Sequence, residues 1–550
     1  MNVGDLIVDY LETIGVDTVF GGSGQSDSAF LFALSRTEKI KTVIPRHEQA
    51  ASFMACGYAM YSDKLGVCFC TAGPGAVNLL SGMAVAYSDS LPLLSLPAYT
   101  PREMRGKGDL GDTSGLNRTP DGQALFSAVT KKSFILEDPS QACDMLEEAI
   151  NLAFEGRPGP VNVHIDYSIY EEEVPNYRPL NFLVRPVLAA QEDLDKAAGV
   201  LTEAINNEKK VMALVGYGTI RSHAEGDLLQ LLESFQIPFC TTMDAKGALP
   251  ETHPLCLGTF GTSGDPDAKE FFKKADVVLA IGNSFAKWNT WRFKDVLFDN
   301  KKLIHINIDS NEIGKVYRAD YPVLSDAKPA IVGLHAKMTA MGAGKMPPET
   351  GSDQFRNVKL EQRSDKIHPA MLVREISRLS PEKSIILGDA GGHMLWLHAY
   401  LTLDKGRNYQ NPGSFGPMAA NVNASIGVKY ANPDRPVIVA CGDGDYQMAG
   451  FELMTAVQEN VPVIWIIFNN SEFNIIKYFQ LRSKDKEVFN HFMNPDYVKY
   501  AEACGAQGFR VTEIDQFEAA FTKALSLGKP ALIDVIVDPD IYPPFAAFDD

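Results

Sequence analysis

Two polar motifs follow apolar runs in the last third of the sequence. Gly442-Asp443-Gly444 follows the run at 437–440, and Asn469-Asn470 ends the run at 461–468. Between the motifs, a three-to-four spacing of apolar residues predicts a one-sided helix: Met448, Phe451, Met454 and Val457. A strand, a glycine turn, a helix and a strand make a βαβ unit, whose strands end at the ligand edge of a parallel sheet. The sequence therefore places Asp443 and the Asn pair at one edge.

The chemistry of this edge is that of hard oxygen ligands. A carboxylate, an amide oxygen and backbone carbonyls suit Mg²⁺, which takes few protein ligands together with phosphate oxygens. Gly442 and Gly444 permit a diphosphate to approach the start of the helix, where backbone N–H groups accept negative charge. The two motifs together favour such a site over an ordinary strand-to-helix turn with a surface Asn pair.

The composition is that of a globular protein with several domains. A chain of 550 residues exceeds one hydrophobic core and predicts about three domains. The net charge of −18 argues against a nucleic-acid partner, because phosphate binding needs a basic face. Eight scattered cysteines predict reduced, buried thiols. The N-terminal segment lacks the basic start of a signal peptide, and the sequence holds no apolar run long enough to span a membrane, so we expect a cytoplasmic enzyme.

Strand and helix patterns alternate along the whole chain. This alternation predicts an α/β fold of three doubly wound parallel-sheet domains. Polar, Pro-bearing or Gly-bearing connections at 167–190 and 341–356 separate them. The predicted domains are 1–170, 190–340 and 365–550.

The first and last domains share a spacing. Thr71 and Pro92 are 21 positions apart, as are Cys441 and Pro462, and each pair joins the end of one strand to the Pro that opens the next. Both segments begin with a glycine-containing turn. We therefore expect the two domains to be copies of one βαβ design.

Glu48 is the carboxyl group that stands out in the first domain. It follows the short strand predicted at 41–45 and precedes a helix predicted at 49–61, among small and apolar residues. Position alone favours a helix-start carboxylate stabilised by the helix dipole. The alternative is a catalytic carboxyl group whose pKa is raised by apolar surroundings. The Asp443 motif favours this alternative.

These motifs resemble those of thiamin diphosphate-dependent enzymes in the acetolactate synthase, 2-hydroxyacyl-CoA lyase and benzaldehyde lyase group. The resemblance covers essentially the whole chain, including VFGGSGQ, RHEQAASFMACGYA, TAGPGAVN, INIDSNEIGK and the GDG and NN motifs. It implies pyrimidine-binding, central and diphosphate-binding domains. It also implies thiamin diphosphate and Mg²⁺ shared between subunits, and hence a homodimer at minimum, commonly assembled as a homotetramer. FAD or ADP in the central domain stays open, since Ser284 stands where a flavin-contacting Arg is expected.

The resemblance also assigns roles to single residues. Glu48 would contact N1′ of the aminopyrimidine, so that the cofactor's amino group can take the C2 proton. Met418 would hold the cofactor bent, and the carbonyl of Gly416 would accept a hydrogen bond from its amino group. The implied metal ligands are Asp443, Asn470 and the carbonyl of Glu472. The other implied cofactor contacts are Pro74, Asn78, Gly391, Gly392, His393, Gly444, Asp445, Phe473, Asn474 and Ile475. Beside a diphosphate, Asp445 must turn away or cap the helix.

Departures from the acetolactate synthases gather around the reacting carbon. The substituted segments are Ser23-Gly24-Gln25, Arg118-Thr119-Pro120, Phe285 to Trp288, and Phe479, which stands for the specificity Trp. Gln25, Thr71 and Gln123 are the candidate substrate contacts, with Gln25 and Gln123 also candidate catalytic residues. Lys287 or Arg118 could replace the lost carboxylate-binding Arg, and each is equally well interpreted as a surface charge.

The implied reaction makes or breaks a carbon–carbon bond next to a carbonyl of a small 2-keto acid, acyloin or acyl-CoA. Acetolactate-type carboligation, 2-keto acid decarboxylation and 2-hydroxyacyl-CoA lyase activity remain open. A cofactor-binding or regulatory homologue without catalysis is the alternative from a different class. Glu48 weighs against it, because a non-catalytic copy has no need of that carboxyl group.

Overall fold

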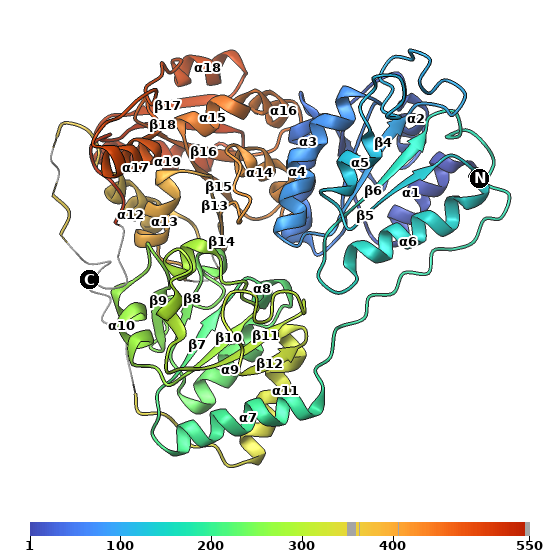
Figure 1. Ribbon diagram of the computed structural model, residues 1–550. Helices are drawn as coiled ribbons and strands as arrows, with labels where there is room; N and C mark the ends of the chain where they lie inside the picture. Colours follow the sequence, from blue (N-terminus) through green and yellow to red (C-terminus); the bar gives the residue numbers. More distant parts are fainter. Residues whose placement is uncertain (349–358, 362–363, 405, 407, 545–550) are drawn as a thin grey trace.

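The computed structural model describes residues 1–348, 359–361, 364–404, 406 and 408–544. It contains three bodies, each a six-stranded parallel sheet flanked by helices (Figure 1). The prediction of three doubly wound parallel-sheet domains is therefore confirmed. A long irregular connection leads from the first body to α7, whereas much of the predicted connection at 341–356 lies outside the described residues.

The first sheet has the strand order β2-β1-β3-β4-β6-β5. Its strands β3, β4 and β6 are buried along their whole length, because helices cover both faces of a parallel sheet. The strands are β1 (Thr18–Gly21), β2 (Lys41–Val43), β3 (Gly66–Cys70), β4 (Leu93–Tyr99), β5 (Lys132–Leu136) and β6 (Pro160–Asp166). The helices are α1 (Val3–Thr13), α2 (Ser28–Ser35), α3 (Glu48–Ser62), α4 (Pro74–Ser88), α5 (Gly122–Ser127) and α6 (Ala142–Phe154).

The last sheet has the order β14-β13-β15-β16-β18-β17, which repeats the first when its strands are renumbered from β13. The expected common design is therefore confirmed. The strands are β13 (Ile385–Gly388), β14 (Asn408–Gln410), β15 (Val437–Gly442), β16 (Val463–Asn469), β17 (Gln507–Val511) and β18 (Ala531–Ile536). The helices are α12 (Pro369–Leu379), α13 (Gly392–Tyr400), α14 (Ala420–Ala431), α15 (Asp443–Ala449), α16 (Leu453–Gln458), α17 (Asn474–Lys484), α18 (Tyr497–Ala503) and α19 (Asp515–Ser526), with the 3₁₀ turn η5 (Gly450–Glu452) between α15 and α16.

The central sheet differs, with the order β12-β11-β10-β7-β8-β9. Counted from β7, this is the 3-2-1-4-5-6 order of dinucleotide-binding folds, which reverses between β7 and β10. The strands are β7 (Val211–Val215), β8 (Phe239–Thr241), β9 (Cys256–Thr259), β10 (Val277–Ile281), β11 (Lys302–Asn307) and β12 (Tyr321–Leu324). The helices are α7 (Gln191–Asn206), α8 (Gly218–Arg221), α9 (Glu225–Phe235), α10 (Pro266–Lys274) and α11 (Ala327–Ala340).

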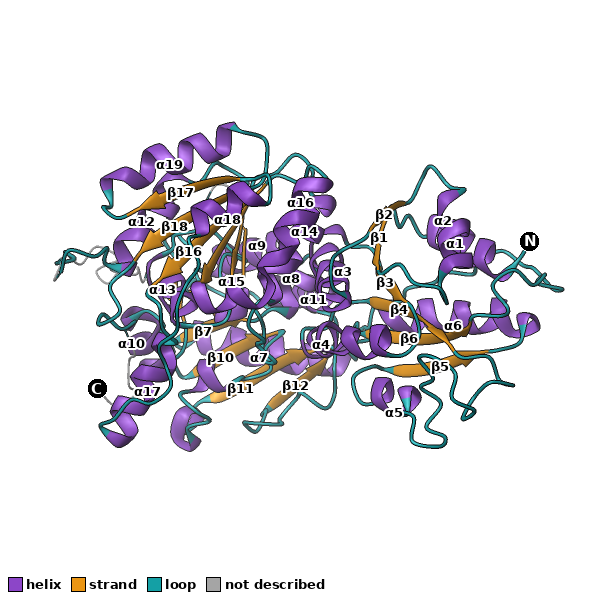
Figure 2. Cartoon of the chain, turned by 90° about the horizontal axis from the view of Figure 1, so that it is seen from above, coloured by secondary structure: helices purple, strands orange, loops and turns teal. Residues whose placement is uncertain are grey.

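Helices α3 and α14 join the first and last domains (Figure 2). Glycines let their backbones touch: a Cβ on Gly57 would lie 2.1 Å from the carbonyl oxygen of Ala424, and one on Gly427 would lie 1.8 Å from that of Met54. Real Cβ atoms do not come so close. The buried residues around this contact form one hydrophobic core that spans both domains. Glu48, the first residue of α3, is thus held by both domains of its own chain.

The segment after Gly444 differs from the predicted one-sided helix. It is divided into α15, η5 and α16. The predicted apolar residues Met448, Phe451 and Met454 face outward, with 61%, 68% and 43% of their surfaces exposed. The sheet is instead covered by Tyr446 and Leu453, which are buried. Of the described helices, none is long and apolar enough to cross a membrane.

Candidate active site

One cavity of about 230 Å³ lies at the carboxyl ends of β13, β15 and β16. Because parallel strands end together, this edge gathers residues that are far apart in the sequence. The predicted residues that line it are Gly391, Gly392, His393, Met418, Asp443, Gly444, Asp445, Asn470, Glu472, Phe473, Asn474 and Ile475. Of the predicted contacts in this domain, only Gly416 lies outside the described lining, on the exposed loop before Met418.

Asp443 is the first residue of α15 and is almost fully buried. Its carboxylate accepts hydrogen bonds from the backbone N–H groups of Gly444 at 2.9 Å, Asn470 at 3.1 Å and Ser471 at 2.6 Å. The side chain of Asn494 adds a fourth donor at 2.8 Å. Burial raises the pKa of Asp443, whereas these donors lower it. The carboxylate is therefore fixed in place before any ligand arrives.

The two residues of the Asn pair have different roles. Asn469 is buried and donates to Asp534 at 2.8 Å, so its side chain supports β16 and β18. Asn470 lines the cavity, and its side-chain oxygen accepts the N–H of Glu472 at 3.3 Å. The side chain of Glu472 points away to Lys477, at 3.1 Å. Of this segment, Asn470 and the backbone of Glu472 are thus the parts that a ligand can use.

Asp445 caps the helix on which it stands. Its Oδ2 accepts the N–H of Gly442 at 2.8 Å, which is one of the two arrangements expected for this residue. Burial, and then the neighbouring Asp389, raise the pKa of Asp445 well above its usual range. His393 lies 3.4 Å from Asp445, and burial lowers its pKa to about 4. The cavity wall next to α13 therefore carries little positive charge of its own.

The start of α15 is open to a close approach by a ligand. A Cβ on Gly444 would lie 2.8 Å from the ring of Phe473 and 3.2 Å from the Cε of Met418. Among the described residues, Nε2 of His393 and Oδ1 of Asp445 are buried polar atoms without a hydrogen-bond partner. Glycine at the helix start, unused polar atoms and hard oxygen donors fit a diphosphate with a divalent metal ion.

Glu48 lies at the corresponding edge of the first sheet. Its Oε2 accepts a hydrogen bond from Asn78 at 3.0 Å. A Cβ on Gly75 would lie 3.2 Å from Oε1, and one on Gly22 would lie 3.4 Å from Cγ. The sequence suggested apolar surroundings, but the nearest neighbours are two glycines and an amide, and the side chain is only half-buried. The glycines leave room for a flat ring against this carboxylate.

The predicted substrate contacts divide into two groups. Gln25 is exposed on the Glu48 edge, as is Pro74, a predicted cofactor contact. A Cβ on Gly24 would lie 2.4 Å from Thr71, which places the 23–25 turn beside Thr71. Gln123 instead uses its amide on Ser133, donating to the backbone oxygen at 2.6 Å and accepting from the hydroxyl at 2.9 Å. Its side chain is thus directed at β5.

The two edges do not meet within one chain. Of the described residues, those that line the 230 Å³ cavity all belong to 369–541, so the Glu48 edge contributes none. The Glu48 edge, with Pro74 and Val77, and the outward side of α15 are both exposed. Among the described residues, the Glu48 edge and the Asp443 cavity are therefore separate.

Two departures noted in the sequence lie side by side. Trp288 of the central domain stacks on Phe479 of α17, with ring centroids 6.3 Å apart and planes 29° apart. The ammonium of Lys287 lies 5.7 Å from the centre of the Trp288 ring. This aromatic pair packs the central domain against α17, whose first residues line the cavity.

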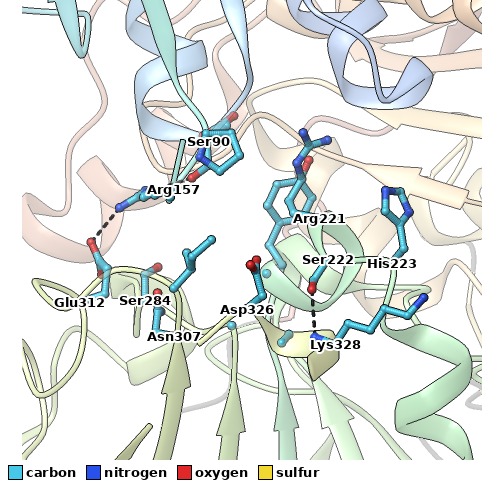
Figure 3. Close-up of a pocket in the computed structure, with 18 of the residues that line it drawn as sticks. Ser90, Arg157, Arg221, Ser222, His223, Ser284, Asn307, Glu312, Asp326 and Lys328 are labelled. Carbon is cyan, nitrogen blue, oxygen red and sulfur yellow. Dashed lines mark hydrogen bonds and ion pairs between the residues drawn. The ribbon is translucent and has the colours of Figure 1, made fainter. Parts of the chain in front are cut away.

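A second cavity, of about 440 Å³, lies between the central domain and both of its neighbours (Figure 3). Arg157 reaches it from the first domain and binds Glu312 at 3.1 Å, while the backbone N–H of Lys328 donates to the hydroxyl of Ser222 at 2.9 Å. Ser284 lines it. The cavity lies at the ends of β7 and β10, where the strand order reverses and open α/β sheets bind ligands.

Asn494 and Glu452 form hydrogen bonds with the candidate site, and the sequence suggested neither residue. Asn494 orients Asp443, and Glu452 contacts the turn before Glu48. Neither stands at a strand end or in a spaced motif, so no sequence pattern marks them. Only tertiary packing brings them to the site.

Three family models match successive parts of the chain. They describe the N-terminal TPP binding domain of thiamine pyrophosphate enzymes at 1–123, the central domain at 199–334 and the C-terminal TPP binding domain at 389–535. Each match falls on a different sheet: the first covers β1 to β4, the second β7 to β12, and the third β14 to β17 with most of β18. The chain belongs to the thiamine pyrophosphate, or thiamin diphosphate, enzymes.

Several relatives of known name are similar to this chain over nearly its full length. The chain is 31% identical to a protein named probable acetolactate synthase large subunit of Methanocaldococcus jannaschii, over 98% of this chain and 92% of the relative. It is 30% identical to the acetolactate synthase large subunit of Corynebacterium glutamicum, over 98% and 88%. A chloroplastic acetolactate synthase of Arabidopsis thaliana is 31% identical, over 97% and 81%. The resemblance inferred from the motifs is thus confirmed.

Proposed function

We propose that this protein is a thiamin diphosphate- and Mg²⁺-dependent enzyme that makes or breaks a carbon–carbon bond next to the carbonyl of a 2-keto acid or an acyloin. The observation that carries the proposal is the pair of complementary edges, one with Asp443 and one with Glu48. The relatives named acetolactate synthase support carboligation as the reaction type. When bound, the cofactor supplies a carbon nucleophile and an electron sink.

The residues of the last domain hold the cofactor. Asp443, Asn470 and the carbonyl of Glu472 would bind the metal ion. Met418 would contact the cofactor, and the carbonyl of Gly416 would accept a hydrogen bond from its amino group. The residues that would surround the diphosphate are Gly391, Gly392, His393, Gly444, Asp445, Phe473, Asn474 and Ile475.

The residues of the first domain act on the cofactor of a partner subunit. Glu48 would hold a proton at the ring nitrogen of the cofactor, and Asn78 orients the carboxylate by donating to its Oε2. Pro74 would contact the same ring. Gln25, Thr71 and Gln123 are the proposed substrate contacts, and Gln123 must release Ser133 to serve as one. This arrangement requires a homodimer, which we propose assembles further into a homotetramer in the cytoplasm.

Because residues near the reacting carbon differ from those of the acetolactate synthases, two other reactions are alternatives to carboligation. Simple decarboxylation of a 2-keto acid, or cleavage of a 2-hydroxyacyl-CoA, would use the same Glu48 and Asp443 edges. The Trp288–Phe479 pair replaces groups that the acetolactate synthases use for the second keto acid. Product analysis separates these reactions, since carboligation yields a 2-hydroxy-2-methyl keto acid from pyruvate and decarboxylation yields an aldehyde.

The test of the proposal is Glu48→Gln in the full chain with thiamin diphosphate and Mg²⁺. The wild type should convert at least one member of a panel of 2-keto acids, acyloins and 2-hydroxyacyl-CoA thioesters. The variant should lose about 10²- to 10⁴-fold in rate, as expected for removing a general acid–base group. Glu38→Gln, which changes an exposed residue of the same domain, should leave the rate unchanged. Equal rates for Glu48→Gln and wild type would show that catalysis through Glu48 is wrong.

We also propose that the 440 Å³ cavity binds a nucleotide such as ADP or FAD. The strand reversal at β7 and β10 and the volume of the cavity support this function. Titration calorimetry with each nucleotide tests it, and a Gly218→Leu variant, which fills the turn after β7, should bind neither. The absence of heat with both nucleotides would contradict the assignment.

A further inference from the structure

Glu452 is a buried carboxylate that reaches from the last domain into the first. It ends η5, in the segment that follows Asp443, and only 4% of its surface is exposed. Oε1 accepts the backbone N–H groups of Arg46 at 3.0 Å and His47 at 3.1 Å, and Oε2 lies 3.1 Å from the N–H of Arg46. The hydroxyl of Thr455 donates to Oε2 at 2.6 Å. One side chain thus holds two consecutive peptide groups of another domain.

The two peptide groups stand immediately before Glu48. His47 is the N-cap of α3, and its Nδ1 accepts the N–H of Gln49 at 3.2 Å. The N–H groups at a helix start have no partner within the helix, so an external acceptor must satisfy them. The helix dipole adds to the attraction for a carboxylate at this point. Glu452 therefore fixes both the position of the cap and the direction in which the helix begins.

The surrounding contacts are weaker and more exposed. The side chain of Arg46 donates to Gln458 at 2.6 Å, and Lys41 pairs with Glu459 at 2.8 Å, with the Lys41 side chain 54% exposed. Exposed pairs of this kind contribute little to structure or stability. Among the contacts between segment 41–47 and the described residues of η5 and α16, the one through Glu452 is buried and takes two backbone donors from that segment. Thr455 of α16 supplies the third donor to the same carboxylate.

We propose that Glu452 is a positioning residue for Glu48. It fixes the 46–47 turn, and so aims the Glu48 carboxylate at the ring nitrogen of the cofactor bound by the partner subunit. The inference rests on the proposed function. In the proposed dimer, Asp443 and Glu452 of one chain belong to the same segment. Asp443 binds the metal ion at one cofactor site, while Glu452 positions the Glu48 carboxylate that acts at the other site.

The test measures the exchange of the cofactor's C2 proton for deuterium, by acid quench and NMR, in the full chain with Mg²⁺ and no substrate. Glu452→Gln keeps the size of the side chain but puts an amide against two N–H donors. We expect the exchange rate to fall about 10- to 100-fold, because a displacement of about 1 Å costs about that much. The dissociation constant of thiamin diphosphate should stay within about threefold, since the Asp443 edge is unchanged.

Glu459→Gln is the matched control. It removes a carboxylate from the same face of the same domain and breaks the pair with Lys41. The amide can still accept from its other two donors, the hydroxyl of Tyr430 and the amide of Gln458. Its exchange rate should equal that of the wild type. Glu452→Asp keeps the charge and the acceptor atoms with a shorter reach, and should give an intermediate rate. It also provides the measurement if Glu452→Gln does not fold, as judged by circular dichroism.

A double variant separates positioning from general damage. If Glu452 acts through Glu48, then Glu48→Gln with Glu452→Gln should exchange no more slowly than Glu48→Gln alone, since coupled residues are non-additive. Wild-type exchange in Glu452→Gln, or a further fall of the same factor in the Glu48→Gln background, would overturn the inference. If Glu48→Gln exchanges as fast as the wild type, the proposed function itself fails, and this outcome is distinct.

Discussion

The first and last domains share one sheet design but carry different chemistry at its edge. Both have the same strand order, and both present a carboxylate at the start of a helix that follows a strand. Asp443 accepts four hydrogen bonds from its own chain and is 2% exposed. Glu48 accepts one side-chain hydrogen bond, from Asn78, and is half-buried.

This difference separates an anchor from a group that is free to react. A carboxylate held by four donors has a fixed position and two oxygens directed by the backbone, which suits a metal ligand. A carboxylate with one donor and glycine neighbours keeps an oxygen available for an external ring. The shared sheet design therefore fixes where each carboxylate lies, whereas the surrounding loops determine its hydrogen bonds and its chemical role, as in other folds that host many functions.

The largest expected effect comes from mixing two inactive variants. Glu48→Gln and Asp443→Asn should each be nearly inactive alone. In a heterodimer of the two, one site takes Glu48 and Asp443 from unmutated positions on opposite chains, so random mixing should restore about a quarter of the wild-type sites. The measurement is product formation after joint refolding or coexpression. If each site were built within one chain, the mixture would stay inactive, and the separation of the two edges would be wrong.

Cofactor affinity should distinguish the two carboxylates next. Asp443→Asn should weaken Mg²⁺-dependent thiamin diphosphate binding by about 100-fold or more, because even residues behind the metal ligands are worth about 10- to 100-fold. Glu48→Gln should change the same dissociation constant only a few-fold. Quenching of tryptophan fluorescence on titration measures both. If both variants lost affinity for thiamin diphosphate to a similar extent, both edges would contribute to cofactor binding, and the distinction between them would be wrong.

The sequence predicted the features that depend on a local residue pattern, but not the contacts that depend on tertiary packing. Apolar runs that end in a glycine turn or an Asn pair indicated Asp443, Asn470 and the strands of the sheets, because strand ends in parallel sheets have a local pattern. Glu452 and Asn494 carry no such pattern, since their partners are about 400 and 50 positions away, brought together only by tertiary packing.

The apolar stripe after Gly444 is an instructive intermediate case. The spacing of Met448, Phe451 and Met454 predicted a face to be covered, but periodicity does not say what covers it. The structure directs these residues away from their own sheet. Under the proposed function, a second copy of the chain would cover this stripe.

Phe451 should therefore matter for assembly. Phe451→Asp should raise the dimer dissociation constant by at least about tenfold, as expected for a buried aromatic residue at an interface. Sedimentation velocity over a dilution series measures it. Leu188→Asp changes an equally exposed apolar residue in the connection before α7 and should leave the dimer unchanged. If Phe451→Asp sediments like the wild type, the stripe does not face a partner.

The smallest effect is expected where the first and last domains of one chain contact each other through two residues at equivalent positions. Asp89 and Glu459 each stand three positions before the Pro that opens the next strand, and each contacts the opposite domain. Glu459 pairs with the exposed Lys41 at 2.8 Å. Asp89 is buried and accepts the N–H of Gly413 at 3.2 Å, on the loop that leads to Met418. Burial, and then Asp244, raise the pKa of Asp89 to about 7, against a partial opposing effect of Gly413 and Arg157.

The sign of the pH dependence follows from this raised pKa. The folded state keeps a proton on Asp89 that the unfolded chain releases near pH 4, so the contribution of Asp89 to stability is lost as the pH rises from about 4 to about 7. Asp89→Asn retains an acceptor for Gly413 and removes the titration. Its melting temperature should rise relative to the wild type between pH 5 and pH 8, by the equivalent of about 1–2 kcal/mol. The upper limit is about 4 kcal/mol, because each of about three pKa units corresponds to about 1.4 kcal/mol. Calorimetry at fixed ionic strength measures the difference, with Glu459→Gln as the variant at the corresponding position. Parallel pH profiles for Asp89→Asn and wild type would show that Asp89 is already ionised in the folded protein, and that the two copies meet the opposite domain through carboxylates of the same kind.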